Sequence, residues 1–263
     1  MALVLRRAVA EDRPAILAIS ATIWDGRDYL PRVLDKWLED QQGYLTVALL
    51  DDQLVGISRL ALPAVGHGWL EGARVHPDCQ GQGVGKAMTR HLVEEARKLG
   101  LRSLRYTTST DNWGSRKLAQ TLGFQERGIW RRYTATPGPI AFSPSQYTGE
   151  IPTPKNGMIP FSWKLVPWQE ELAVQWRKEQ AVWGTAQAGM VLVRDSRPER
   201  MLVPLLWGEA AHLSLLLAFA RMARPGVEKI HFVTENYDHE QALLAAGFKR
   251  AEIDMVLYDF PMA

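Results

Sequence analysis

One glycine-rich segment, Val75 to Gly85, constrains this chain more than any other part of its sequence. It reads Val-His-Pro-Asp-Cys-Gln-Gly-Gln-Gly-Val-Gly, follows an extended segment from Trp69 to Val75, and runs into an amphipathic helical pattern from about Lys86 to Leu99. A strand, a glycine loop and a helix N-terminus in that order expose several backbone N–H groups in one place, and the helix dipole adds partial positive charge there. The segment therefore predicts a site for an anion, most simply a phosphate or pyrophosphate.

Two common phosphate-binding loops do not fit the spacing. A P-loop needs a glycine, four residues and then Gly-Lys-Ser/Thr, whereas Gln80 stands in place of the first glycine and Ala87 in place of the hydroxyl residue. The dinucleotide loop needs Gly-x-Gly-x-x-Gly or Ala, whereas Lys86 occupies the third position after Gly81 and Gly83. Neither a nucleotide triphosphatase nor a dinucleotide-binding protein is indicated.

The spacing Gln80-x-x-Gly83-x-Gly85 resembles the acetyl-CoA-binding loop of the GCN5-related N-acetyltransferase (GNAT) superfamily. Further features of that family occur in the same order over about the first 135 residues: Glu71, Val75, Pro77, a strand from Ser103 to Thr108, Asn112, and Leu122-Gly123-Phe124. An ordinary glycine turn without a ligand is the alternative, but it does not explain the rest of the series.

The resemblance implies acetyl-CoA as co-substrate, no metal, and a set of binding residues. It assigns the pantetheine arm to Val75 and Asn112, with Ser115 nearby, although Asn112 could simply cap the following helix. It assigns the pyrophosphate to the loop and the first helical residues, Gln80, Gly81, Gln82, Gly83, Val84, Gly85 and Lys86.

Glu71 is the predicted general base, since an ordinary aliphatic amine is protonated at neutral pH and must lose a proton before it attacks a thioester. Strand alternation predicts Glu71, Ala73 and Val75 on one face. Many family members carry the carboxylate two residues earlier, where this chain has Trp69. The competing interpretation is a structural ion pair between Glu71 and Arg74 or another cation.

A tyrosine that many relatives use to protonate the leaving thiolate is replaced here by Ala119. Tyr29, Tyr106 and Tyr133 are candidate substitutes, and solvent can also supply the proton.

The acceptor site is predicted from the first helix–helix loop, which in this fold commonly forms one wall. That loop carries Trp24, Asp25, Asp28 and Tyr29. Asp28 could instead cap the second helix. Asp28-Tyr29-Leu30-Pro31, Trp37 and Glu71-Gly72-x-Arg74-Val75 together are similar to the histidine N-acetyltransferase group. The expected activity is acetylation of a small primary amine, such as the α-amine of an amino acid. Acetylation of a protein N-terminus or lysine, and non-catalytic acyl-CoA sensing, are the alternatives.

The expected fold is a mixed α/β, acyl-CoA N-acyltransferase fold with a mostly antiparallel sheet flanked by helices, followed by a second, diverged copy. Asn112 lies twelve residues before Phe124, and Asn236 lies twelve residues before Phe248, with a strand on either side of each pair. The copy lacks the ligand loop, because Trp207-Gly208-Glu209 stands in its place. The expected domains are a catalytic domain at 1–135, a Pro-rich linker at 136–157 and a degenerate domain at 158–263.

Composition sets the remaining expectations. With 31 Lys and Arg against 29 Asp and Glu, the net charge of +2 does not indicate a nucleic acid or membrane partner. The single cysteine, Cys79, excludes an internal disulfide and is compatible with a reducing compartment. The N-terminal apolar run is too short for a signal peptide. We therefore expect a cytoplasmic monomer or homodimer.

Overall fold

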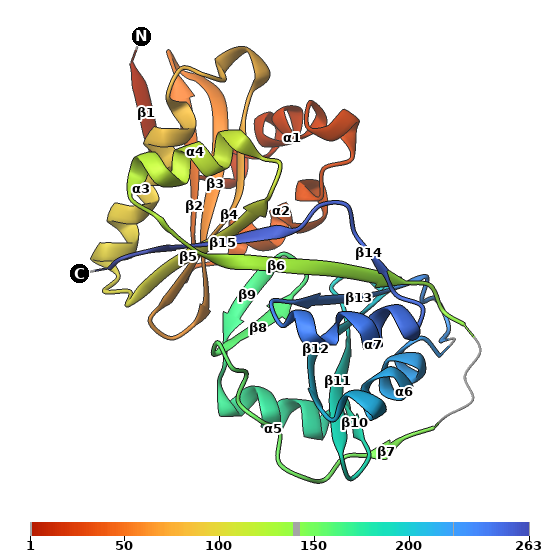
Figure 1. Cartoon of the computed structure of the whole chain (residues 1–263). Helices are drawn as coiled ribbons and strands as arrows, with labels where there is room; N and C mark the ends of the chain where they lie inside the picture. Colours follow the sequence, from red (N-terminus) through yellow and green to blue (C-terminus); the bar gives the residue numbers. More distant parts are fainter. Residues whose placement is uncertain (1, 139–142, 223, 263) are drawn as a thin grey trace. The chain divides into compact units, whose positions relative to one another are not determined.

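The computed structural model describes residues 2–138, 143–222 and 224–262. Its chain divides into two compact units (Figure 1). The first comprises Met1–Tyr106, Gly114–Glu126 and Tyr258–Ala263, and the second comprises Thr107–Trp113 and Arg127–Leu257. Residues 139–142 of the predicted linker lie outside the described part.

The first unit contains a sheet in which neighbours along the chain pair with each other. β1 pairs with β2, β2 with β3 and β3 with β4, all antiparallel, whereas β4 and β5 are parallel. The strands are β1 (Leu3–Arg7), β2 (Tyr44–Leu50), β3 (Gln53–Ala64), β4 (His67–Val75) and β5 (Ser103–Ser109), of which β5 ends in the second unit. The helices are α1 (Arg13–Ala21), α2 (Leu30–Glu39), α3 (Val84–Lys98) and α4 (Trp113–Leu122).

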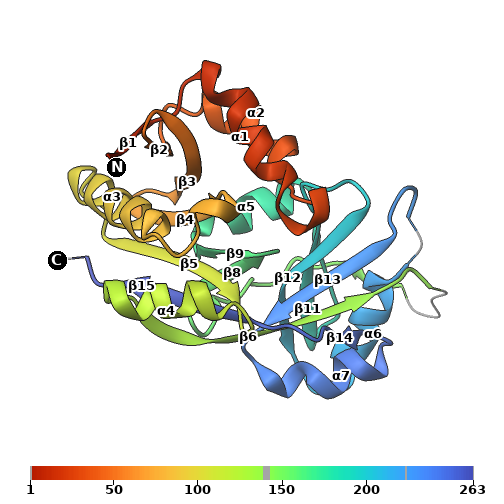
Figure 2. The ribbon, with the colours of Figure 1, turned by 90° about the horizontal axis from the view of Figure 1, so that it is seen from above.

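Apolar side chains on both faces of this sheet explain its helical cover (Figure 2). Ile16 of α1 and Leu34 and Trp37 of α2 form one cluster with Val47 and Ile57 of the sheet. On the opposite face, α3 contributes Val84 and Met88 to a second cluster with Ala48, Val55 and Val75. Each helix thus buries one apolar stripe, as expected for an amphipathic helix on a sheet.

A bulge interrupts β4 just before the glycine loop. Arg59 of β3 lies opposite Glu71 and Ile57 lies opposite Arg74, so β4 carries one residue more than β3 between these pairs. Gly72 has φ of +69°, and a Cβ there would lie 2.6 Å from Cζ3 of Trp37. Simple alternation therefore fails at Gly72, because the extra residue changes the parity. The prediction that Glu71, Ala73 and Val75 share a face is wrong, and Glu71 shares its face with Arg74 instead.

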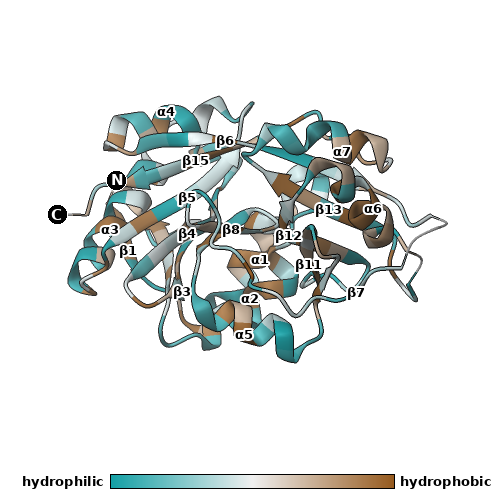
Figure 3. Cartoon of the chain, turned by 60° about the horizontal axis from the view of Figure 1, so that its bottom comes forward, coloured by the Kyte–Doolittle hydropathy of each residue, from teal (hydrophilic) through white to brown (hydrophobic). Residues whose placement is uncertain are grey.

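The second unit also has a mostly antiparallel sheet with one parallel pair, β12 and β13, joined by α6. Helix α6 is apolar along most of its length (Figure 3), and Leu213, Leu216, Leu217 and Phe219 are buried. The elements are β6 (Gln125–Ala135), β7 (Ser145–Gln146), β8 (Met158–Phe161), β9 (Lys164–Pro167), α5 (Glu170–Lys178), β10 (Val182–Gly184), β11 (Ala188–Arg194), β12 (Arg200–Gly208), α6 (Ala210–Ala220), β13 (Lys229–Thr234), α7 (Glu240–Ala245), β14 (Lys249–Arg250) and β15 (Met255–Phe260), of which β6 begins and β15 ends in the first unit.

The turns after α4 and α7 have the same geometry. Gly123 and Gly247 both have positive φ, +85° and +80°. The Phe124 N–H donates to the carbonyl of Ala119 at 2.9 Å, and the Phe248 N–H donates to that of Leu243 at the same distance. A left-handed glycine with such a bond is a common way to end a helix.

Three elements of the second unit differ from what the sequence suggests. A helical pattern runs from about Trp168 to Trp183, but α5 ends at Lys178, since Gln180 has φ of +54° and Val182–Gly184 pairs with β11. The Pro-rich segment is more than a spacer, because β7 pairs with β10 and Ile151 is buried in a core cluster. The hairpin of β8 and β9 was not expected.

The end of the chain belongs to the first unit. Tyr258 stacks on Tyr106 with ring centroids 5.4 Å apart, and Phe260 packs against Phe124 at 5.0 Å. Asp259 accepts a hydrogen bond from Nε of Arg105 at 3.0 Å. The first unit is therefore completed by Tyr258 to Phe260, and not only by the first 135 residues.

Candidate active site

The glycine loop of the first unit leaves open space above the N-terminus of α3. A Cβ placed on Gly81 or Gly83 would meet no atom within 4 Å, although both residues have positive φ, +76° and +86°. The Gln80 and Gln82 side chains fold back and donate to the carbonyls of Val75 and Asp78, at 3.2 and 2.9 Å. These two hydrogen bonds hold the loop, and the open space lies next to the first turn of α3, whose N–H groups have no partner within the helix.

Next to this loop, β4 and β5 separate. Their parallel pairing runs from His67 with Ser103 to Trp69 with Arg105 and goes no further. The rest of β4, including Glu71 and Val75, pairs only with β3 within the part of the chain that the structure describes. A strand end that pairs with only one neighbouring strand, beside an anion-binding loop, suits a ligand that has an amide-bearing arm attached to a phosphate.

Glu71 lies in a chain of three charged side chains. Arg59 donates from Nη1 to Oε1 of Glu71 and from Nη2 to Oδ2 of Asp40. All three are largely buried, with side-chain exposures of 12% for Arg59, 14% for Glu71 and 25% for Asp40. The guanidinium also lies over the ring of Trp37, 5.0 Å from its centroid. Glu71 thus has a cationic partner, Arg59, of the kind that the structural interpretation expects.

Sequence reasoning missed Arg59 and Asp40. Arg59 is the one charged residue in the run Val55-Gly56-Ile57-Ser58-Arg59-Leu60-Ala61-Leu62. A charge within a buried apolar strand needs a partner, and that signal was available.

Arg74 contacts the predicted acceptor loop through hydrogen bonds and aromatic rings. It donates from Nε and Nη2 to the two carboxylate oxygens of Asp28 at 3.0 and 2.8 Å. Its guanidinium carbon lies 4.6 Å from the ring centroid of Trp24 and 5.3 Å from that of Tyr29. The Asp28 side chain is only 1% exposed. The Arg74–Asp28 pair therefore positions the two aromatic rings.

The loop itself is strained and exposed. Trp24 and Asp25 are non-glycine residues with φ of +48° and +55°. The Trp24 residue is 58% exposed. Asp25 pairs with neighbouring Arg27 at 3.3 Å, and both side chains are mostly exposed. Consecutive left-handed residues cost energy, so their presence beside Arg74 fits a loop shaped for contact with a ligand.

The other residues singled out in the sequence lie on or next to α3 and α4. Asn112 precedes α4 and belongs to the segment Thr107–Trp113, which is part of the second unit. Ser115 lies in α4, and its carbonyl accepts the Tyr106 hydroxyl at 3.1 Å. Lys86 is half-buried in the first turn of α3. Ala119 is buried.

The three candidate tyrosines differ in their surroundings. Burial raises the pKa of Tyr106 to about 12, and burial also raises the pKa of Tyr29, where Arg74 opposes and Glu71 reinforces the effect. Tyr133 is buried in the second unit, where its hydroxyl donates to Glu240. Of the three, Tyr29 lies in the same charge network as Glu71.

Buried aspartates make the first unit sensitive to acid. The hydrogen bond from Arg6 lowers the pKa of Asp12. Burial opposes ionisation of Asp28, but Arg74 and Ser20 outweigh it, so its pKa also lies below the ordinary value of 3.8. The ionised forms of these two aspartates stabilise the folded state at pH values above the ordinary pKa of 3.8. This stabilisation is lost as the pH falls through their lowered pKa values.

We therefore expect Asp28→Asn to unfold about 3 kcal/mol more easily at pH 7, and the difference from wild type to shrink as the pH falls towards 3. Urea unfolding across this range measures it. Asp52→Asn is the control, since Asp52 is exposed in the β2–β3 turn at φ of +64°, which asparagine tolerates. A difference that does not vary with pH would contradict this account of Asp28.

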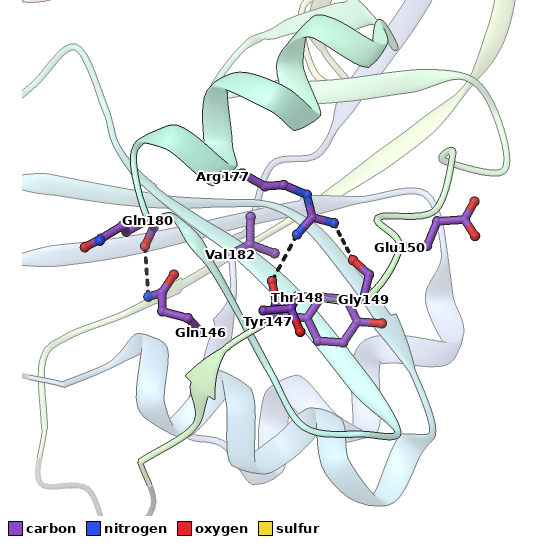
Figure 4. Close-up of a pocket in the computed structure, with 8 residues that line it drawn as sticks. All are labelled: Gln146, Tyr147, Thr148, Gly149, Glu150, Arg177, Gln180 and Val182. Carbon is purple, nitrogen blue, oxygen red and sulfur yellow. Dashed lines mark hydrogen bonds between the residues drawn. The ribbon is translucent and has the colours of Figure 1, made fainter.

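Other parts of the described chain offer less chemistry. No cluster of three or more His, Cys, Asp or Glu in the described residues could hold a metal ion. No described helix has both the length and the apolar character needed to cross a membrane. A pocket of about 610 Å³ in the second unit is lined by Tyr147, Glu150 and Arg177 among others (Figure 4). There Arg177 donates to the carbonyls of Tyr147 and Gly149, so its guanidinium links α5 to the segment that contains these two residues.

The open loop, the separated strands and Glu71 beside them together define the site of an acyl-CoA N-acyltransferase fold. Residues 13–124 match the Acetyltransferase (GNAT) family. The first half of the chain therefore resembles an N-acetyltransferase domain.

Two curated relatives share parts of this region. The chain is 39% identical over 62 residues to [Ribosomal protein bS18]-alanine N-acetyltransferase of Escherichia coli K12, and 32% identical over 88 residues to histidine N-acetyltransferase of Oreochromis niloticus. These matches cover 24% and 33% of this chain, and only 42% and 26% of the two relatives.

Solved structures resemble the whole chain in fold. An acetyltransferase described as putative, from Thermoplasma acidophilum, matches with a TM-score of 0.67 at 16% identity over 98% of this chain and 99% of its own. A GCN5-related N-acetyltransferase from Sphaerobacter thermophilus also gives a TM-score of 0.67, at 13% identity over 99% of this chain and 96% of its own. At such identities the likeness concerns the fold alone.

Proposed function

We propose that the protein transfers an acetyl group from acetyl-CoA to a primary amine, with Glu71 as the general base. The observation that carries this proposal is the juxtaposition on β4 of a buried carboxylate, a bulge and an open glycine loop. The match of residues 13–124 to the family supports the same activity. The transfer takes place in the first unit.

Each group has a definite part in the proposed reaction. Acetyl-CoA supplies the acetyl group as a thioester. Glu71 takes a proton from the acceptor ammonium, directly or through water, so that the amine nitrogen can bond to the acetyl carbon. The nitrogen then releases a second proton to solvent, and the carbon–sulfur bond breaks to leave the amide and the thiolate. A backbone N–H near the end of β4 stabilises the charge that develops on the carbonyl oxygen. The leaving thiolate is stable enough to take its proton from solvent or from Tyr29.

The loop fits the pyrophosphate of coenzyme A. Side chains at Gly81 and Gly83 would fill the open space beside the helix N-terminus, so the glycines keep that space free. Val84, which is 2% exposed, anchors the loop to the core. Lys86 in the first turn of α3 adds positive charge, while Val75 and Ser115 remain the proposed contacts of the pantetheine arm within this unit.

The acceptor is proposed to be a small molecule with an α-amine. The loop of Trp24, Asp25, Asp28 and Tyr29 lies against Arg74 and, through Tyr29, beside Glu71, and one relative is named for histidine. A second candidate, the N-terminal amine of a protein, is favoured by the relative that is named for alanine of ribosomal protein bS18.

We further propose that the second half is a diverged copy that has lost the coenzyme site. Its β12–α6–β13 order repeats β4–α3–β5, and the turns at Gly123 and Gly247 match. At the position of the loop, however, a Cβ on Gly208 would lie 2.3 Å from the carbonyl oxygen of Gln187. This turn is packed against the chain, whereas the loop of the first unit is open.

A panel of amines tests the proposed function. Purified protein, acetyl-CoA and single acceptors (amino acids including histidine, peptides beginning with alanine, and lysine peptides) are mixed, and free CoA thiol is followed over time. We expect turnover with amino acids. Turnover with peptides alone would instead select the protein acceptor. Tight CoA binding without turnover across the panel would leave acyl-CoA sensing as the function.

A further inference from the structure

Arg59 donates hydrogen bonds to two carboxylates at once, and one of them belongs to the proposed base, Glu71. Its two terminal nitrogens bind Glu71 and Asp40 separately, and all three groups are mostly shielded from solvent. A buried guanidinium that loses its only anionic partner is costly, by several kcal/mol. When Glu71 takes up a proton, Arg59 loses one of its two negative partners.

Asp40 is held in place independently of Glu71. Its Oδ1 accepts the backbone N–H groups of Gln42 and Gly43 at 3.0 and 3.2 Å, which leaves Oδ2 for Arg59. Burial disfavours the charged form of Asp40, but the hydrogen bonds from Arg59 and from this backbone outweigh it and lower its pKa. Asp40 therefore stays ionised while Glu71 changes charge.

We propose that Asp40 is a positioning residue for acetyl transfer, which keeps Arg59 paired while Glu71 is protonated. This inference rests on the proposed role of Glu71 as the base. Because Asp40 stays paired with Arg59, the guanidinium keeps an anionic partner in place while Glu71 gains and releases a proton in every turnover.

Arg74, another cation near Glu71, also has its own anionic partner. Arg74 shares the face of β4 with Glu71, but Asp28 neutralises it through two hydrogen bonds. Tyr29, from the loop before α2, adds a neutral phenol to the same surroundings. Single substitutions at Arg59 or Asp40 can thus change the charge near Glu71 without breaking the Arg74–Asp28 pair.

Two substitutions should move the pH dependence in opposite directions. Arg59→Gln removes the cation, so the acid limb of the kcat/KM profile should move to higher pH by about one unit. Asp40→Asn leaves Arg59 with Glu71 alone, so the limb should move to lower pH by about one unit and kcat should fall several-fold. The double variant should return towards the wild-type limb.

Several controls separate this role from a merely structural one. Arg59→Lys keeps the charge and should keep the limb near its wild-type position. Asp35→Asn breaks the exposed pair with Arg13, in which the side chains are 46% and 62% exposed, and should leave the profile unchanged. ¹³C NMR titration of the Glu71 carboxyl carbon should show the same opposite shifts without any acceptor.

The outcomes distinguish the two proposals. If Glu71→Gln keeps the wild-type rate, the base assignment is wrong and the role of Asp40 fails with it. If Glu71→Gln is inactive, but Asp40→Asn and Arg59→Gln leave the limb and the NMR titration in place or shift them in the same direction, only the role of Asp40 is overturned.

Discussion

Glu71→Gln should reduce kcat for acetyl transfer by about 10²–10⁴-fold and leave the dissociation constant of CoA within about twofold of wild type. The amide cannot take a proton from the acceptor, but it keeps the size of the carboxylate and can accept a hydrogen bond from Arg59. Arg59 also stays paired with Asp40, so the fold should tolerate the change. Steady-state kinetics and calorimetric titration with CoA measure the two quantities.

Glu94→Gln is the matched control for this experiment. Glu94 lies on the exposed side of α3 within the same unit, and its substitution should change neither quantity. Loss of CoA binding in Glu71→Gln would show that the carboxylate supports the fold of the site. An unchanged kcat would remove Glu71 from the mechanism and leave the acetyltransferase activity without its base.

Gly83→Ala should weaken CoA binding by about tenfold or more and lower stability by only about 1 kcal/mol. The new methyl group meets no protein atom within 4 Å, so its direct effect on packing is small. It projects, however, into the space beside the helix N-terminus that we assign to the pyrophosphate. Calorimetric titration with CoA and urea unfolding separate the two effects.

Gly100→Ala at the other end of α3 provides a close control. Gly100 has φ of +65° and also has nothing within 4 Å of a built Cβ. The backbone strain of the two substitutions should therefore be similar, whereas only Gly83→Ala should affect CoA. Equal CoA affinities in the two variants would place the pyrophosphate elsewhere.

The strand, the glycine loop and the helix of the candidate site lie where the sequence predicts them. The spacing of the loop, the preceding strand and the following helix are local features, and local features determine where a glycine loop meets a helix. The side chains around Glu71 were harder to predict, because the parity of β4 changes at the bulge. Gly72 within an otherwise regular strand was the available signal for that bulge.

Long-range pairing explains most of what the sequence did not reveal. Arg59, the partner of Glu71, comes from β3, and Asp40, the second partner of Arg59, is the residue after α2; no periodicity encodes these sequence separations. The strand at Val182–Gly184 appeared helical because its apolar residues extend the pattern of α5, and pairing with β11 decides otherwise. Arrangement into two units likewise depends on where Tyr258–Phe260 packs.

The place of Tyr258 to Phe260 in the first unit also affects biosynthesis. A ribosome makes the glycine loop and Glu71 early, yet the aromatic cluster of Tyr106 and Phe124 lacks its last members until about 130 further residues have been made. The first unit therefore cannot finish folding co-translationally ahead of the second. A nascent chain that stalls within the second half would carry every residue of the acetyl-transfer site in an incomplete sheet.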